Sequence, residues 1–246
     1  MISIVIPVYN NADYLPEALY SALSQEVEKE IIIVDDGSED GSVPAAVAGL
    51  GSDSRRLVRV IRHDSRMGAA ISRMDGVRTA VGEYIAFLDA DDMWNRDKLA
   101  KQVRKLKKTG APICCTARQY MGKDGDTRNK TVHVPGRITL SSMLKTNLIT
   151  CSSVLVKKSS ILAHPMSHDE AQEDYLAWLR IIEAEGPAAG IDEPLTYYRV
   201  VKGSKSHSKL KSAAMTLRTY RLFGLKGLPL AKSFAAYALN GVIKHI

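Results

Sequence analysis

The segment YIAFLDADDMW, residues 84–94, joins an apolar run directly to three carboxylates. The run predicts a buried strand, because strands that are covered on both faces are apolar without alternation. Asp89, Asp91 and Asp92 follow it, and their like charges repel one another. The D-x-D spacing lets two carboxylates point to the same side, and such oxygen ligands suit Mg²⁺ or Mn²⁺. The alternative is that these acids cap the helix that follows, which fits Asp92 best.

The same pattern of an apolar strand and a polar loop occurs earlier in the chain. Apolar, β-branched runs predict strands at 3–9, at the start of 30–42 and at 57–62. Apolar residues at helical spacing predict helices, which are expected at 15–23, 68–81 and 97–108. This alternation favours an α/β fold with a parallel, doubly wound, Rossmann-like sheet flanked by helices.

The second half of the chain is mixed. Strands are expected at 111–120, 152–156 and 195–201, and a helix at 174–184. The polar segment 123–130 is expected to be a loop. Two amphipathic helices are predicted in the tail, and they cover 209–223 and 230–243 on either side of the break GLKGLP (224–229).

The composition limits the class of protein. The chain has 246 residues, 45% apolar and 25% charged, which suits one large or two small folded domains. The first residues lack the basic n-region of a signal peptide, and no apolar run reaches the roughly 18–20 residues that span a membrane. Three cysteines without a C-x-x-C pair suggest neither a disulfide framework nor a zinc site. A reducing, cytoplasmic location is therefore expected.

The net charge of +7 is concentrated in the tail, because the last acidic residue is Glu193 and ten Lys and Arg residues follow it. Such asymmetry predicts an anionic partner, namely a membrane surface, phosphates or nucleic acid. An apolar stripe in the first tail helix, with basic residues beside it, fits anionic lipid. The stripe consists of Leu210, Ala213, Ala214 and Leu217. Packing against the catalytic part or a second subunit remains the alternative.

Ligands of open α/β sheets bind beyond the carboxyl ends of the strands, so polar residues at 7–11, 35–38, 63–68 and 89–92 are expected to converge. Asp36 is a candidate to accept a hydrogen bond from a nucleobase, although an Asp-Gly turn explains it equally. Arg62, His63 and Arg66 lie in the same region, but nothing in the sequence singles one out.

Two further candidates lie on predicted helices. Arg73 lies one turn into a predicted helix, in the pattern Gly68-x-x-x-x-Arg73-x-x-Gly76. It is placed to contact phosphate, and the alternative is that it is a surface arginine. Asp174 is placed to take a proton from an acceptor hydroxyl. Trp178, four residues later on the same face, would form a floor for a sugar ring. The alternative for this pair is helix capping and core packing.

Taken together, SIVIPVYN, IIIVDDGSEDGS, GAAISRMDG, GEYIAFLDADDMW and QEDYLAWLRI, in this order, resemble family 2 glycosyltransferases from Ser3 to about Arg199. These are inverting nucleotide-sugar enzymes of GT-A fold. The chain is most similar to bacterial polysaccharide enzymes of the teichuronic-acid, O-antigen and capsule type. The resemblance implies a catalytic domain at 1–207, with a nucleotide-sugar half at about 1–110 and an acceptor half at about 111–207. The basic helical tail then occupies 208–246.

The resemblance also implies roles for single residues. Pro7, Tyr9 and Asp36 would hold the uracil and ribose of a UDP-sugar. Asp89 would lie near the ribose, and Asp91 would bind Mn²⁺ or Mg²⁺.

Asp174 would be the catalytic base, Arg73 would contact the donor, and Glu173 and Trp178 would contact the acceptor. The chain departs from the family pattern in two places. Met74 follows Arg73 where many members have Asn. Members often have a His or another polar residue after the Tyr-Arg pair, whereas Val200 and Val201 follow Arg199 here and the first His is His207.

The implied reaction moves a hexose from a UDP-sugar to a sugar hydroxyl of a polyprenyl-diphosphate-linked acceptor, at the inner face of the cell membrane. A nucleotidyltransferase is the main alternative, because acidic strand ends also serve those enzymes, but it would release pyrophosphate rather than UDP. A carbohydrate-binding relative without activity is disfavoured by the intact Asp91 and Asp174. No nucleic acid partner is expected, since basic and aromatic residues are not interleaved and the chain has three Phe.

Overall fold

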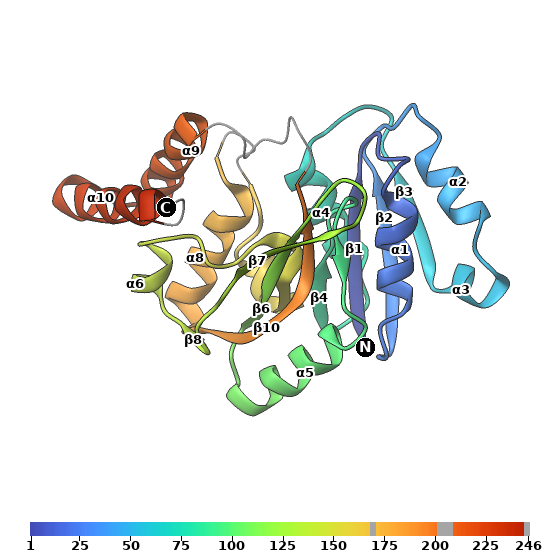
Figure 1. Ribbon diagram of the computed structural model, residues 1–246, viewed down its shortest axis with the longest axis horizontal. Helices are drawn as coiled ribbons and strands as arrows, with labels where there is room; N and C mark the ends of the chain where they lie inside the picture. Colours follow the sequence, from blue (N-terminus) through green and yellow to red (C-terminus); the bar gives the residue numbers. More distant parts are fainter. Residues whose placement is uncertain (168–170, 201–208, 244–246) are drawn as a thin grey trace.

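The computed structural model describes residues 1–167, 171–200 and 209–243 (Figure 1). Its strands are β1 (Ile2–Val8), β2 (Lys29–Asp35), β3 (Val58–Arg62), β4 (Tyr84–Phe87), β5 (Met93–Trp94), β6 (Ile113–Met121), β7 (Thr127–Val132), β8 (Arg137–Ile138), β9 (Val154–Lys157) and β10 (Ala188–Arg199). Its helices are α1 (Leu15–Leu23), α2 (Ser42–Ala48), α3 (Ser52–Arg56), α4 (Ala69–Thr79), α5 (Lys98–Thr109), α6 (Leu140–Met143), the 3₁₀ turn η1 (Cys151–Ser153), α7 (Lys158–Ala163), α8 (Glu173–Glu185), α9 (Lys209–Leu222) and α10 (Gly227–Ile243).

The strands form one sheet in the order β3-β2-β1-β4-β9-β6-β10-β5, with β7 beside β6 and β8 beside β10. The first four strands are parallel, as the alternating pattern predicts, and β10 is also parallel to β6. β9 runs antiparallel between β4 and β6 and so joins the two halves of the sheet. The predicted α/β fold is confirmed.

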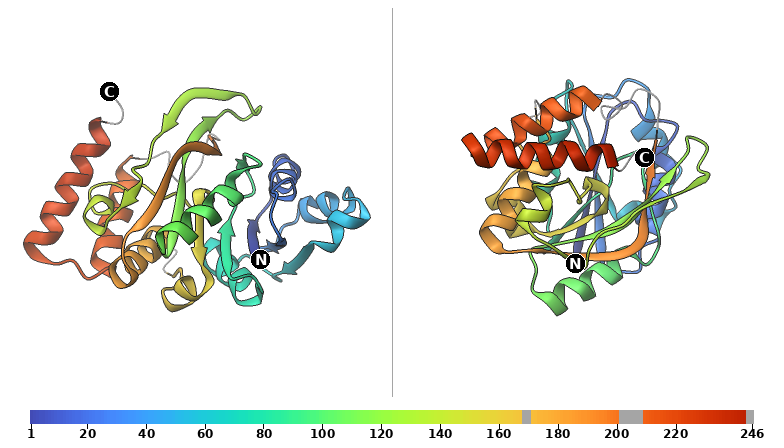
Figure 2. Two further views of the ribbon diagram at one scale, coloured as in Figure 1. Left: turned by 90° about the horizontal axis from the view of Figure 1, so that it is seen from below. Right: turned by 60° about the vertical axis from the view of Figure 1, so that its left-hand side comes forward.

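Alternate residues of the strands pack on opposite faces. Ile4 of β1 lies in the core that includes Leu19 of α1 and Leu99 of α5. Its neighbour Val5 lies in the other core, which contains residues of α4 and α8. The sheet is therefore a middle layer with helices on both faces, as the two views of Figure 2 show.

Two predicted segments of the second half are wrong. The polar stretch 123–130 is not a loop throughout, because β7 pairs antiparallel with β6 after a turn in which Gly125 has φ +84°. The final strand begins at Ala188 rather than 195, since it pairs with β6 through irregularities between Ile191 and Thr196. Backbone hydrogen bonds to β6 therefore form these strands, although their side chains do not alternate between apolar and polar.

The tail forms the two predicted helices, and Ala213, Ala214 and Leu217 of the apolar stripe of α9 are not fully buried. Ala214 is exposed, whereas Thr216, Thr219 and Tyr220 are buried. Both threonine hydroxyls donate to carbonyl oxygens one turn earlier in α9, so they enter the core without an unmet hydrogen bond. Tyr220 belongs to the same core as α8. Among the described helices, none is both long and apolar enough to cross a membrane.

Candidate active site

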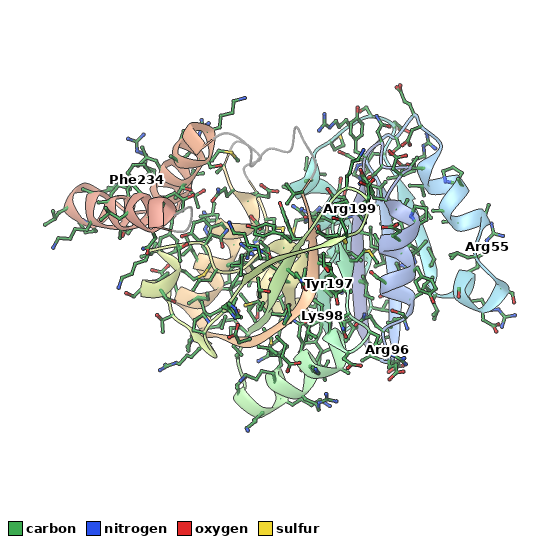
Figure 3. All side chains as sticks on the ribbon, in the orientation of Figure 1. Arg55, Arg96, Lys98, Tyr197, Arg199 and Phe234 are labelled. Atoms are coloured by element: carbon green, nitrogen blue, oxygen red, sulfur yellow. The ribbon has the colours of Figure 1, made fainter. Side chains whose placement is uncertain are left out.

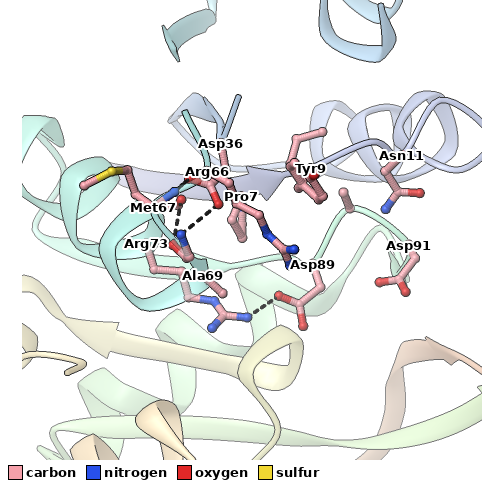
Figure 4. Close-up of a pocket in the computed structure, with 14 residues that line it drawn as sticks. Pro7, Tyr9, Asn11, Asp36, Arg66, Met67, Ala69, Arg73, Asp89 and Asp91 are labelled. Atoms are coloured by element: carbon pink, nitrogen blue, oxygen red, sulfur yellow. Dashed lines mark hydrogen bonds and ion pairs between the residues drawn. The ribbon is translucent and has the colours of Figure 1, made fainter. Parts of the chain in front are cut away.

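The carboxyl ends of β1, β2 and β4 and the start of α4 enclose a pocket of about 460 Å³ (Figure 4). This confirms that the polar segments predicted to converge do so at one edge of the sheet. The lining residues are Pro7, Val8, Tyr9, Asn11, Asp36, Arg66, Met67, Gly68, Ala69, Ser72, Arg73, Asp89, Ala90 and Asp91.

Asp36 shapes one wall of the pocket. Its carboxylate accepts hydrogen bonds from the backbone N–H groups of Met67 (2.8 Å) and Gly68 (2.9 Å). His63 lies 2.9 Å from the same carboxylate through Nδ1, and 3.1 Å from Asp75 through Nε2. Burial raises the pKa of Asp36, but these hydrogen bonds outweigh it and lower the pKa below its usual value. Asp36 is therefore an ionised acceptor that fixes the loop before α4.

Tyr9 offers an aromatic face at the mouth of the pocket. Its side chain is 41% exposed, and the guanidinium of Arg66 lies 4.2 Å from the ring centroid. Arg66 is a pocket residue that the sequence alone did not single out. Its only sequence signal is its position just before Gly68, in the loop that carries Asp36's hydrogen-bond donors.

Asp89, Asp91 and Asp92 have three different environments. Asp89 forms an ion pair of 2.7 Å with Arg73. Asp91 lines the pocket, and burial together with the charge of Asp89 raises its pKa to about 6. Asp92 is buried beneath the loop, and burial and the charges of Asp91 and Asp89 raise its pKa well above the usual value.

The helix-capping interpretation of Asp92 is wrong. α5 begins at Lys98 after Asp97, and the carboxylate of Asp92 instead accepts the backbone N–H of Arg199 at 2.9 Å. The reason is that β5 intervenes between Asp92 and α5, which the sequence pattern does not reveal.

Arg73 connects the pocket to α8. Its Nη2 contacts Asp89 at 2.7 Å and its Nη1 contacts Glu173 at 2.8 Å. The side chain of Arg73 is 8% exposed, so the surface-arginine alternative is wrong. In the described structure Arg73 is a bridge between two carboxylates, and Glu173 is held at the first turn of α8.

Asp174 follows Glu173 at the start of α8, and its Oδ1 accepts the N–H of Tyr175 at 2.7 Å. Burial, followed by the charge of Glu173, raises the pKa of Asp174 to about 7. A carboxylate with that pKa is suited to accept a proton near neutral pH.

Trp178 does not offer a floor to a sugar in this structure. The side chain is fully buried, with 0% exposure, and its ring lies 6.3 Å from that of Phe87. Its position on the face of α8 that packs on the sheet explains the burial, so the core-packing alternative holds. His207 lies outside the described residues.

The sequence model of glycosyl transferase family 2 matches residues 3–157. This chain is a family 2 glycosyltransferase. The predicted resemblance and the predicted enzyme class are thereby confirmed, and the matched region includes the three acids that line the pocket, Asp36, Asp89 and Asp91.

Several relatives match this glycosyltransferase along its whole length. A Bacillus subtilis protein, the putative teichuronic acid biosynthesis glycosyltransferase TuaG, is 32% identical over 248 residues, covering 100% of this chain and 98% of the relative. An Escherichia coli protein, the UDP-Glc:alpha-D-GlcNAc-diphosphoundecaprenol beta-1,3-glucosyltransferase WfaP, is 32% identical over 246 residues, covering 100% of this chain and 95% of the relative.

Solved structures of other glycosyltransferases share the fold. The mannosyltransferase PcManGT from Pyrobaculum calidifontis, in complex with GDP-Man and Mn²⁺, superposes with a TM-score of 0.74 at 20% identity, covering 96% of this chain and 68% of that one. Residues 1–349 of TarS from S. aureus, in complex with UDP-GlcNAc, superpose with a TM-score of 0.71 at 16% identity, covering 96% of this chain and 71% of that one. The glycosyltransferase thus has the GT-A fold.

Proposed function

We propose that this enzyme transfers a hexose, with inversion, from a UDP-sugar to a sugar hydroxyl of a polyprenyl-diphosphate-linked acceptor in bacterial surface polysaccharide synthesis. Both substrates follow the printed activity of the E. coli relative, and polysaccharide synthesis follows the printed role of the B. subtilis relative. The observation that carries the proposal is the bridge through Arg73, which joins the pocket aspartate Asp89 to Glu173, the residue before Asp174.

Donor binding is assigned to the pocket of 460 Å³. Tyr9 and Pro7 would face the uracil, and the ionised Asp36 would accept hydrogen bonds from the nucleoside. All the pocket residues lie within residues 1–110, which supports the nucleotide-sugar half as a functional unit of a catalytic domain at 1–207.

Asp174 would act as the base. It would remove the proton of an acceptor hydroxyl, whose oxygen then attacks the anomeric carbon from the face opposite UDP. The bond from that carbon to the diphosphate breaks, and UDP leaves with the electron pair. An α-linked donor therefore gives a β-linked product. The part of Glu173 in acceptor binding stays a prediction.

The acids of the pocket fit a divalent cation. Asp91 has a raised pKa because of burial and the nearby charge of Asp89, and a cation relieves this crowding. No group of three or more acidic, His or Cys side chains is assembled for a metal within the described ranges. Asp91 would therefore hold Mg²⁺ or Mn²⁺ jointly with the diphosphate and water. When bound, such an ion neutralises charge on the leaving group.

The lipid part of the acceptor gives a role to α10. The solvent-facing side of α10 carries Leu228 and Leu239, which are 65% and 66% exposed. Lys226 and Lys232 lie near them, and no acid follows Glu193 in the chain. We propose that α10 rests on the anionic inner face of the cell membrane, where a lipid-linked acceptor is also located.

The direct test compares the native chain with Asp174→Asn, using UDP-sugars, Mn²⁺ and a synthetic GlcNAc-diphosphate-lipid. We expect the variant to lose transfer by about 10²–10⁴-fold, since it cannot accept a proton, while UDP affinity stays near the native value. Equal loss of transfer and of UDP binding would contradict the role of Asp174. Release of pyrophosphate instead of UDP by the native chain would contradict sugar transfer.

A further inference from the structure

Arg199, the last residue of β10, has a guanidinium that is almost completely enclosed. Its side chain is 1% exposed, and Figure 3 shows it at the end of β10 close to α1. The group carries five N–H donors in one plane. Their acceptors are the backbone oxygens of Asp91 (2.8 Å), Lys123 (2.7 Å) and Gly122 (3.3 Å), the carboxylate of Glu17 and the sulfur of Met93 (3.7 Å).

These partners come from three segments that are distant in the sequence. Glu17 belongs to α1, Asp91 and Met93 to the segment after β4, and Gly122 to the turn between β6 and β7. The ring of Tyr14 covers the guanidinium at 4.5 Å. Since every donor direction has a partner, the planar group fixes the relative positions of all three segments.

The contact to Asp91 matters most for the pocket. Nε of Arg199 donates a hydrogen bond to the carbonyl oxygen of Asp91. The backbone N–H of Arg199 donates to the carboxylate of Asp92. At the other end of the same loop, the N–H of Asp89 donates to Ser152 Oγ at 3.1 Å. The backbone on both sides of the Asp91 side chain is thereby fixed.

We propose that Arg199 is a positioning residue that aims the Asp91 carboxylate into the pocket, so that the cation and the diphosphate bind together. This inference rests on the proposed metal role of Asp91. Arg199 does not line the pocket, so it acts on Asp91 from behind the loop, through hydrogen bonds to the backbone and through the positive charge of its guanidinium. Lysine is a poor substitute, because one ammonium cannot serve acceptors spread around a plane.

The experiment measures UDP affinity by calorimetry, with and without Mn²⁺, for the native chain, Arg199→Met and Arg199→Lys. We expect Mn²⁺ to tighten UDP binding to the native chain, and this gain to fall by about tenfold in Arg199→Met, as for other groups that orient a metal ligand. Affinity without metal should remain native. Arg199→Lys should recover little of the gain, and it provides the test if Arg199→Met does not fold.

Two control variants distinguish a specific effect of Arg199 from a general loss of stability and test the metal role of Asp91. Tyr220→Phe removes a buried hydroxyl that donates to Leu144 O at 2.7 Å, far from the loop, and should lower thermal stability without changing the Mn²⁺ gain. Asp91→Asn should abolish the gain. A native gain that Asp91→Asn removes but both Arg199 variants keep would overturn the inference about Arg199. Absence of any gain in the native chain would instead refute the metal role of Asp91.

Discussion

The ionisation of Asp174 leads to a prediction about how the rate of transfer depends on pH. Burial and the charge of Glu173 raise its pKa to about 7, and only the ionised form can accept a proton. The rate of transfer should therefore rise by about tenfold per pH unit below this value and level off above it. Glu173→Gln removes the neighbouring negative charge and should move the midpoint to lower pH. Rate profiles of both proteins between pH 5 and about 9 check this, and an unchanged midpoint would contradict the assigned cause.

Three aspartates of one loop show what single residues reveal before the structure is known. Their spacing was enough to predict an acidic site, and two of them do line the pocket. The burial of Asp92 could not be predicted from the sequence, because its partner Arg199 lies more than a hundred positions later. The same holds for Trp178, whose residue type suits a sugar platform and a core equally well. The face of α8 that packs on Phe87 decides between the two.

Helix α4 lies unusually close to β1 at Gly76. A Cβ on this residue would come within 2.4 Å of Val5 Cγ1, and Val5 is fully buried. Gly76→Ala gains about 1 kcal/mol of helix propensity, but overpacking costs about 1–3 kcal/mol. We expect a net loss of stability and weaker transfer, since Arg73 lies one turn earlier on α4.

The cause is tested by making room for the new methyl group. Val5→Ala alone opens a cavity, yet in the double variant the two changes compensate, with a coupling of about 0.5–3 kcal/mol in urea unfolding. Gly49→Ala is the matched control, because a Cβ there meets no atom closer than 3.8 Å and φ is −73°. Strictly additive effects of Gly76→Ala and Val5→Ala would refute the close contact.

At the scale of elements, prediction succeeded where side-chain periodicity and backbone pairing agree. The buried strands β1, β2 and β4 and the helices α1, α5 and α8 all follow that rule. It failed for β7, whose polar residues pair with β6, and for the first half of β10, where register shifts between Ile191 and Thr196 interrupt the pairing with β6. The sequence made no prediction of which face of α9 is buried, because a threonine that bonds its own helix packs as an apolar residue does.

At the scale of the whole molecule, the basic residues of α9 and the long, poorly covered helix α10 lie at the same end. α10 and the α2–α3 pair lie at opposite ends in both Figure 1 and Figure 2. The sequence predicted an anionic partner for the tail but did not separate the two tail helices. In the structure α9 contributes Tyr220 to the main core, whereas α10 has no fully buried residue from Gly227 to Asn240. The proposed lipid contact is accordingly assigned to α10.

Point variants test this contact better than truncation, because a chain that ends before α9 would also lose Tyr220 from the core. Leu228 and Leu239 are about three helical turns apart and so lie on one side of α10. Replacing both with Gln should reduce binding to phosphatidylglycerol-containing vesicles at least about tenfold, since each buried leucine contributes about 1.5–3 kcal/mol.

The matched control for these vesicle measurements is Leu162→Gln, an exposed leucine (44%) on α7 that should leave binding unchanged. Vesicles of phosphatidylcholine alone should bind the native chain less, because the basic residues of the tail then lack an anionic surface. Equal sedimentation of all three proteins with both vesicle types would exclude α10 as the lipid-binding element. If instead the native chain sediments as a dimer without lipid, and the double variant as a monomer, the apolar side of α10 serves a second copy of the chain rather than a membrane.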